Sequence, residues 1–321
     1  MQQNKQEMKV AVVGTGVIGN GWITRFLAQG YHVTAFDPAE GAEARTRQSV
    51  SRAWESVEKL GVAEGASLDR LTFVPTIEEA VKDAYLIQEN VPEREDLKKS
   101  VLGSIDRYAE PDAIIGSSTS GIKPSILQED LLHPERFMVA HPFNPVHILP
   151  LVELVGGQST EQTVIKQAAA FYESIQMKPL VVQQEIEGHI ADRLMEALWR
   201  EALHLVNDGI ATTEEVDAAI IYGAGLRWAQ MGPFLTFHLA GGEQGMRHML
   251  KQFGPALKLP WTKLEAPELT DELKEKVVEG CENHAGDKTV AELEDKRDEF
   301  LVKLLDLVEE YWPESKSLIK N

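Results

Sequence analysis

The sequence predicts an α/β fold, in which a Rossmann-like, doubly wound and mostly parallel sheet is followed by an all-helical C-terminal domain. Three observations support this prediction. Short apolar runs alternate with charged segments of helical periodicity through the first half of the chain. A glycine-rich turn at residues 14–19 joins the first apolar run to the first helical segment. After about residue 187 the strand patterns stop, and only helical patterns follow.

The strands are expected where apolar residues run continuously, because parallel strands are covered by helices on both faces. These runs occupy residues 8–13, 32–36, 71–74, 85–88, 113–116, 137–140, 151–155 and 179–182.

The helices are expected where apolar residues recur at helical spacing. One follows the glycine turn at 17–29, and another lies at 161–175, between the last two strands. We expect a first domain at residues 1–186 and a second at residues 187–321. Helical patterns in the second domain cover 190–208, 213–222, 233–250, 272–283 and 290–311.

Charge and composition exclude several classes of protein. The 321 residues include 51 acidic and 32 basic side chains, a formal net charge of −19, which disfavours binding to nucleic acid or to an anionic membrane. A hydrophobic content of 43% and a charged content of 26% are typical of a folded globular protein. We expect no nucleic acid partner and no membrane association.

The single cysteine, Cys281, allows no internal disulfide and no cysteine-based zinc site. The first residues lack the apolar segment of a signal peptide, and no apolar run is long enough to span a membrane. The expected location is therefore the cytoplasm. We expect no metal site, because the histidine and cysteine spacings do not match one.

The glycine turn has the pattern G-x-G-x-x-G between a strand and a helix, and Asp37 ends the next strand. Gly14 permits a tight turn, Gly16 lets a pyrophosphate approach the helix N-terminus, and Gly19 allows close packing of helix on strand. Asp37 would accept hydrogen bonds from ribose hydroxyls and repel a 2′-phosphate, which favours NAD over NADP. FAD remains an alternative, since it uses a similar pattern. The expected dinucleotide contacts in this turn are Gly14, Gly16, Val17, Ile18 and Gly19.

A histidine follows the strand at 137–140, at the sheet edge where open α/β folds bind ligands. His141 begins the segment His-Pro-Phe-Asn-Pro, and Glu153 lies on the following strand. A carboxylate that holds a histidine fixes its tautomer and raises its basicity, so the pair could abstract an alcohol proton while hydride leaves for a nicotinamide.

Taken together, several motifs resemble the L-3-hydroxyacyl-CoA dehydrogenase superfamily: the turn 14–19, Ser-Thr-Ser at 118–120, the segment 141–145, Leu-Val-Glu at 151–153 and Met-Gly-Pro-Phe at 231–234. The resemblance implies an NAD-binding domain and a helical domain that builds a homodimer. It implies that His141 is the acid/base and that Glu153 orients it. It further implies that Ser120 contacts substrate and that Glu93, Lys98 and Asn144 contact the cofactor.

One position departs from the family pattern. The family usually has G-x-x-x-N-R near the first long helix of the second domain, and this chain has Asp192 in place of the asparagine. A carboxylate there would disfavour an anionic substrate and favour a cationic one. Local pairing of Asp192 with Arg193, or capping of the helix, is the simpler structural alternative.

The segments 187–194, 196–202, 223–233 and 253–261 resemble the branch of this superfamily that oxidises L-carnitine at its 3-hydroxyl to 3-dehydrocarnitine. A quaternary ammonium group offers no N–H and is held by aromatic faces, and Phe143 lies beside the proposed base. The expected substrate contacts are therefore Ser120, Phe143 and Asp192. Two alternatives stay open: a dehydrogenase for 3-hydroxyacyl-CoA or a gulonate-type hydroxy acid, and a non-catalytic, crystallin-like NAD-binding protein.

Overall fold

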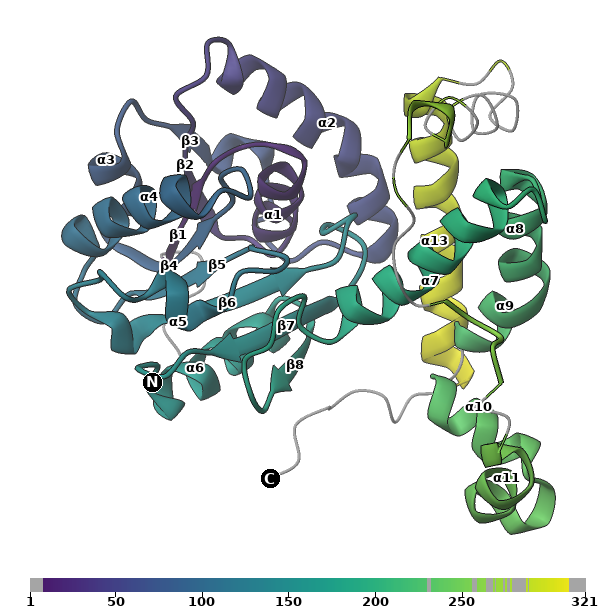
Figure 1. Ribbon diagram of the computed structural model, residues 1–321. Coiled ribbons are helices and arrows are strands. Elements are labelled where there is room, and N and C mark those ends of the chain that lie inside the picture. Colours follow the sequence, from purple (N-terminus) through teal and green to yellow (C-terminus); the bar gives the residue numbers. More distant parts are fainter. Residues whose placement is uncertain are drawn as a thin grey trace. The chain divides into compact units, whose positions relative to one another are not determined.

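The strands form one sheet in the order β3-β2-β1-β4-β5-β6-β7-β8, as the computed structural model shows (Figure 1). The structure describes residues 8–229, 232–255, 259–263, 268, 270–273, 275, 278, 287 and 289–311. Each expected strand is present, and the predicted Rossmann-like class is confirmed. The strands are β1 (Lys9–Val13), β2 (His32–Phe36), β3 (Leu71–Phe73), β4 (Ala84–Glu89), β5 (Ile114–Ser117), β6 (Phe137–Pro142), β7 (Leu151–Gly156) and β8 (Lys178–Val182).

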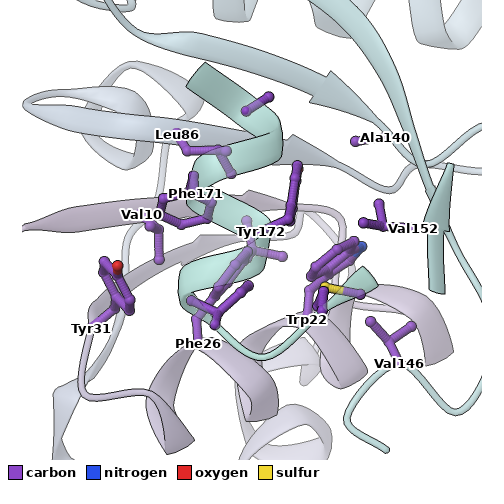
Figure 2. Packing of buried hydrophobic residues seen from close by; sticks show 14 of the residues in the cluster. Val10, Trp22, Phe26, Tyr31, Leu86, Ala140, Val146, Val152, Phe171 and Tyr172 are labelled. Carbon is purple, nitrogen blue, oxygen red and sulfur yellow. The ribbon is translucent and has the colours of Figure 1, made fainter. Parts of the chain in front are cut away.

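Helices cover both faces of the sheet, because successive side chains of a buried strand point to opposite faces. Val10 and Val12 of β1 join a core with α1, α2 and α6, whereas Ala11 and Val13 join a second core with α3, α4 and α5. Figure 2 shows the first core, where rings from α1 and α6 pack together. These helices are α1 (Val17–Ala28), α2 (Ala42–Leu60), α3 (Ile77–Val81), α4 (Glu95–Tyr108), α5 (Pro124–Leu127) and α6 (Gln162–Ser174), with short 3-10 turns η2 (Leu68–Arg70) and η3 (Pro134–Arg136).

One pair of neighbouring strands is antiparallel, and it determines the geometry of the site. The segment 143–150 between β6 and β7 is too short for the crossover that parallel strands need. The chain therefore turns back, and β7 pairs antiparallel with β6 with His141 directly opposite Glu153. All other neighbouring strands of the sheet are parallel.

The chain divides into two compact units, one running to Asp192 and the other from Arg193 to Pro313. The expected boundary between residues 186 and 187 lies a few residues before this division and stays a prediction. In the described part of the second unit, every regular element is helical. Its helices are α7 (Ala191–Asn207, which begins in the first unit), α8 (Thr213–Ala219), the π-helical turn η4 (Ile220–Ala224), α9 (Gly225–Trp228), α10 (Pro233–Ala240), the 3-10 turn η5 (Gly242–Gln244), α11 (Gly245–Phe253) and α13 (Val290–Tyr311).

Two expected helices differ from those observed. The helix expected at 213–222 continues through a π-helical turn to Trp228. The helix expected at 233–250 is broken between α10 and α11, because Gly242 and Gly245 adopt left-handed backbone with φ of 63° and 60°. The expected helix at 272–283 falls largely outside the described residues, as do Met231 and Cys281. In the described part of the chain, no helix is both long enough and apolar enough to cross a bilayer.

Candidate active site

The glycine turn between β1 and α1 has the form expected for a dinucleotide-binding loop. Gly14 has φ of +88°, and a Cβ atom there would lie 2.8 Å from the carbonyl carbon of Asn90. A Cβ atom on Gly19 would lie 2.0 Å from the carbonyl oxygen of Gly14. At Gly16, by contrast, a Cβ atom would meet nothing within 4 Å. The backbone is therefore tightly packed at Gly14 and Gly19 and open at Gly16, where no side chain of the described residues caps the N-terminus of α1. Val17 is exposed, and Ile18 packs against the core.

Asp37 is held against this turn directly after β2. Its Oδ2 atom accepts hydrogen bonds from the Thr15 amide at 2.8 Å and from the Thr15 hydroxyl at 3.1 Å. Its Oδ1 atom accepts one from the Ala39 amide at 2.9 Å. A hollow of about 540 Å³ opens beside the carboxylate, and its lining includes Gly41, Arg47 and Phe73. The open glycine backbone, the helix N-terminus and the adjacent carboxylate together fit the pyrophosphate and ribose of NAD.

A second carboxylate ends β4 and is fully buried. Glu89 accepts hydrogen bonds from the Lys98 ammonium at 3.0 and 3.2 Å, from the Val91 amide at 2.6 Å and from the Ser117 hydroxyl at 2.5 Å. Burial raises the pKa of the Glu89 carboxyl, and the favourable contacts from Lys98, Ser117 and Val91 offset only part of that rise. Lys98, expected from the sequence to contact the cofactor, is only 1% exposed and is bound to Glu89.

Glu93 lies between β4 and α4 and organises the loop after β5. Its Oε1 atom accepts hydrogen bonds from the Thr119 hydroxyl at 2.5 Å, the Ser120 amide at 3.0 Å and the Gly121 amide at 3.1 Å. Its Oε2 atom lies 3.5 Å from the Lys98 ammonium. The structure thus brings Glu93, Lys98 and Ser120 together, and the Ser120 side chain is exposed.

His141 and Glu153 form the pair that the sequence predicts, across the two antiparallel strands. The Nδ1 atom of His141 lies 3.0 Å from the Oε2 atom of Glu153, and both side chains are buried. The other carboxylate oxygen of Glu153 accepts hydrogen bonds from the amides of Ile190 at 2.9 Å and Ala191 at 3.0 Å, at the start of α7. Burial alone would raise the pKa of Glu153, but the hydrogen bonds from His141, Ala191 and Ile190 outweigh it and leave that pKa below its ordinary value.

Asp192 lies on the other side of the His141 ring. Its Oδ2 atom is 3.6 Å from the Nε2 atom of His141, and its side chain is 18% exposed. The Phe143 ring meets the His141 ring edge to face, with centroids 5.9 Å apart. Asn144 is exposed on the loop after β6.

Sequence reasoning missed two buried residues at this site. Glu89 sits where an apolar strand ends in a carboxylate, a signal that could have identified it. His189 follows Gly188, lies 5.4 Å from His141 between ring centroids and has φ of +46°. Only its position in the fold, beside the proposed base, distinguishes it from the other histidines.

The family follows from comparison with known sequence families. The family model described as "3-hydroxyacyl-CoA dehydrogenase, NAD binding domain" matches residues 9–186. The model for the C-terminal domain of the same enzymes matches residues 188–280. The chain belongs to the 3-hydroxyacyl-CoA dehydrogenase family. It is an NAD-dependent oxidoreductase, and the expected family, cofactor and enzyme class are confirmed.

Its relatives include proteins named L-carnitine dehydrogenase. The one from Oceanobacillus iheyensis is 73% identical over 305 residues, covering 95% of this chain and 99% of the relative. The one from Pseudomonas putida is 58% identical over 298 residues, covering 93% of each chain.

Solved structures share the fold of this chain at lower sequence identity. An NAD-dependent 5-formyl-3-hydroxy-2-methylpyridine 4-carboxylic acid 5-dehydrogenase has a TM-score of 0.78 and 27% identity, covering 94% of this chain and 98% of that one. FadB2 from M. tuberculosis has a TM-score of 0.64 and 29% identity, covering 84% and 93%.

Proposed function

We propose that this protein oxidises the 3-hydroxyl group of L-carnitine to give 3-dehydrocarnitine, with His141 as the base and Glu153 as its orienting partner. The observation that carries the proposal is the chain of contacts from Asp192 through His141 and Glu153 to the amides at the start of α7. The relatives named L-carnitine dehydrogenase, which cover most of this chain, support the choice of substrate.

The mechanism uses the tautomer that Glu153 selects. The carboxylate accepts the Nδ1–H of His141, which leaves a lone pair on Nε2 for the proton of the substrate hydroxyl. As that proton moves to Nε2, the O–H electrons form the C3=O bond and the C3–H bond breaks with its electron pair. NAD⁺, when bound at the glycine turn, would supply the acceptor for this hydride. The ionised Glu153 then stabilises the imidazolium on His141.

The charge beside the base suits a substrate that carries a cation. Asp192 lies 3.6 Å from the atom that takes the proton, so a trimethylammonium group near it meets a negative charge. The neighbouring Phe143 ring adds an aromatic face, worth about 0.5–2 kcal/mol for a good contact with a cation. A thioester of coenzyme A, which is strongly anionic, gains nothing from Asp192.

The remaining expected contacts form part of the same proposal. The exposed Ser120 is proposed to donate a hydrogen bond to the substrate through its hydroxyl, and the bond from its backbone amide to Glu93 supports this role. Glu93, Lys98 and Asn144 are proposed to contact the nicotinamide half of NAD, and Asp37 to contact the adenosine ribose.

The test is a comparison of initial rates of NADH formation with L-carnitine, 3-hydroxybutyrate, 3-hydroxybutyryl-CoA and gulonate. L-carnitine should give the highest kcat/KM, and Asp192→Asn should raise its KM roughly tenfold, because about 1.4 kcal/mol of attraction is lost. The same substitution should leave the KM for 3-hydroxybutyrate unchanged or lower. A higher kcat/KM with the CoA thioester would overturn the substrate assignment, and no NADH with any substrate would favour the non-catalytic alternative.

We also propose that two copies of the chain form a homodimer in the cytoplasm through the helical unit. Large apolar side chains lie exposed on its helices, among them Leu194 and Trp199 of α7 and Phe234 of α10, which is 82% exposed. Exposed apolar groups of this size commonly mark an interface. Light scattering of the purified protein should give the mass of two chains, and a monomer at micromolar concentration would refute the dimer.

A further inference from the structure

His189 is buried beside the proposed base but has no part in the mechanism above. Its side chain is fully inaccessible, and its backbone adopts φ of +46°, just after Gly188 at +71°. Its ring lies 5.4 Å from that of His141 between centroids, at an angle of 51°. A polar side chain held in a left-handed conformation at the start of α7 calls for a physical explanation.

One ring nitrogen of His189 has a partner, and that partner fixes the tautomer. The Nε2 atom lies 3.2 Å from the carbonyl oxygen of Thr119. A carbonyl only accepts, so Nε2 carries the hydrogen and donates it. The Nδ1 atom is then an acceptor, and it is buried with no hydrogen-bond partner among the residues that the structure describes. Burial lowers the pKa of His189, which keeps the imidazole neutral next to His141.

The hydrogen bond from His189 joins the two halves of the site. Its own segment leads into Ile190 and Ala191, whose amides hold Glu153 and thereby His141. The carbonyl that it binds belongs to the loop 118–121, which carries Ser120. Glu93 accepts hydrogen bonds from the same loop, from the Thr119 hydroxyl and the Ser120 amide. Loop 118–121 is therefore held by two sets of hydrogen bonds. Those to Glu93 connect it to the proposed cofactor contacts, and the one from His189 connects it to the acid/base pair.

We propose that His189 is a positioning residue, whose Nε2–H bond to Thr119 sets the substrate-contacting loop 118–121 in register with the His141–Glu153 pair. An apolar ring at this position would avoid the unpaired Nδ1, which costs about 1–3 kcal/mol. The imidazole recovers stability only through the bond to Thr119. The proposed role of His189 is to align the substrate with the base. Alignment matters because a displacement of 1 Å between reacting groups reduces turnover by as much as about 100-fold.

The inference rests on the proposed function of this site, and three variants test it. His189→Gln places an amide nitrogen as far from Cβ as Nε2, so it can still donate to Thr119. His189→Asn places its amide at the position of Nδ1, out of reach of Thr119, and asparagine tolerates a positive φ. His189→Phe keeps the ring and removes both nitrogens. Steady-state rates with L-carnitine are normalised to folded protein, and NADH binding is measured by fluorescence titration.

We expect kcat/KM to fall about 10- to 100-fold in the Asn and Phe variants and to return to within about threefold of wild type in the Gln variant. The Kd for NADH should stay within about twofold in all three, because Glu93 still holds the loop on the cofactor side. Equal losses in the Gln and Asn variants, or full activity in the Phe variant, would overturn the inference.

Failure of the proposed function gives a different result. A wild-type protein that leaves L-carnitine unreacted refutes the substrate, and the same three variants are then compared on the hydroxy substrate that the wild type does oxidise. A loss confined to thermal stability, with unchanged kcat/KM per folded enzyme, shows that His189 is only structural and overturns the positioning role.

Discussion

Glu89 and Glu153 are both fully buried carboxylates of the same sheet, yet the pKa of Glu89 is raised and that of Glu153 is lowered. Glu89 has a full positive charge beside it, from Lys98 at 3.0 Å. Glu153 instead has the Nδ1 atom of His141 and two amides at the N-terminus of α7.

The difference shows that hydrogen bonds from a histidine and from two amides at a helix N-terminus can outweigh the burial of a carboxylate, whereas a lysine beside Glu89 does not. This arrangement suits the pair with His141, because a lysine next to that histidine would oppose the positive charge that His141 takes up in the proposed reaction. Glu89 serves a different purpose, since its bonds to Lys98, Ser117 and Val91 tie β4, β5 and α4 together.

The largest expected effect is on catalysis at Glu153. In Glu153→Gln the amide oxygen can still accept from the start of α7, but the amide nitrogen donates towards Nδ1 of His141 and forces the proton onto Nε2. The base is then in the wrong tautomer, and kcat should fall by about 10³-fold. Steady-state NADH formation measures the loss. Glu89→Gln is the matched control and should lose far less, and a kcat within tenfold of wild type in Glu153→Gln would contradict the assigned role.

The next effect is on stability at Lys98. Lys98→Met leaves Glu89 buried without its cation and should lower the free energy of unfolding by about 3–5 kcal/mol at pH 7. Chemical denaturation measures this loss. The double variant with Glu89→Gln should recover a large part of it, because the stranded charge is removed. A single-variant loss below about 1 kcal/mol would mean that Glu89 takes up a proton or is reached by water once Lys98 is removed, and would contradict a stranded charge.

The smallest effect is an opposite pH dependence of the two carboxylates. The lowered pKa of Glu153 contributes stability above its unfolded pKa of about 4.3, and that stability is lost as the pH falls through the folded pKa. The raised pKa of Glu89 contributes stability below the unfolded pKa, and that stability is lost as the pH rises through the folded value.

The wild type should therefore gain stability relative to Glu153→Gln as the pH rises. Relative to Glu89→Gln, the wild type should lose stability over the same range. Urea unfolding at a series of pH values between 4 and 7 measures both differences. Slopes of the same sign would show that the two environments do not differ in the way described.

The sequence determined the parts of this protein that depend on local pattern. The glycine turn, Asp37 and the eight strands follow from residues close together in the chain, because steric limits at glycine and strand periodicity act over a few positions. His141 and Glu153 were also predicted as a pair, since the short link 143–150 brings their strands together.

The tertiary structure decided what distant segments do to one another. The amides of Ile190 and Ala191 hold Glu153. Lys98 is buried against Glu89, and His189 binds the loop 118–121. Burial and hydrogen bonding depend on which groups approach through space, so no spacing in the chain marks these contacts. The pattern of residues determined the elements, whereas the packing of those elements determined the groups that surround each carboxylate and the direction in which its pKa shifts.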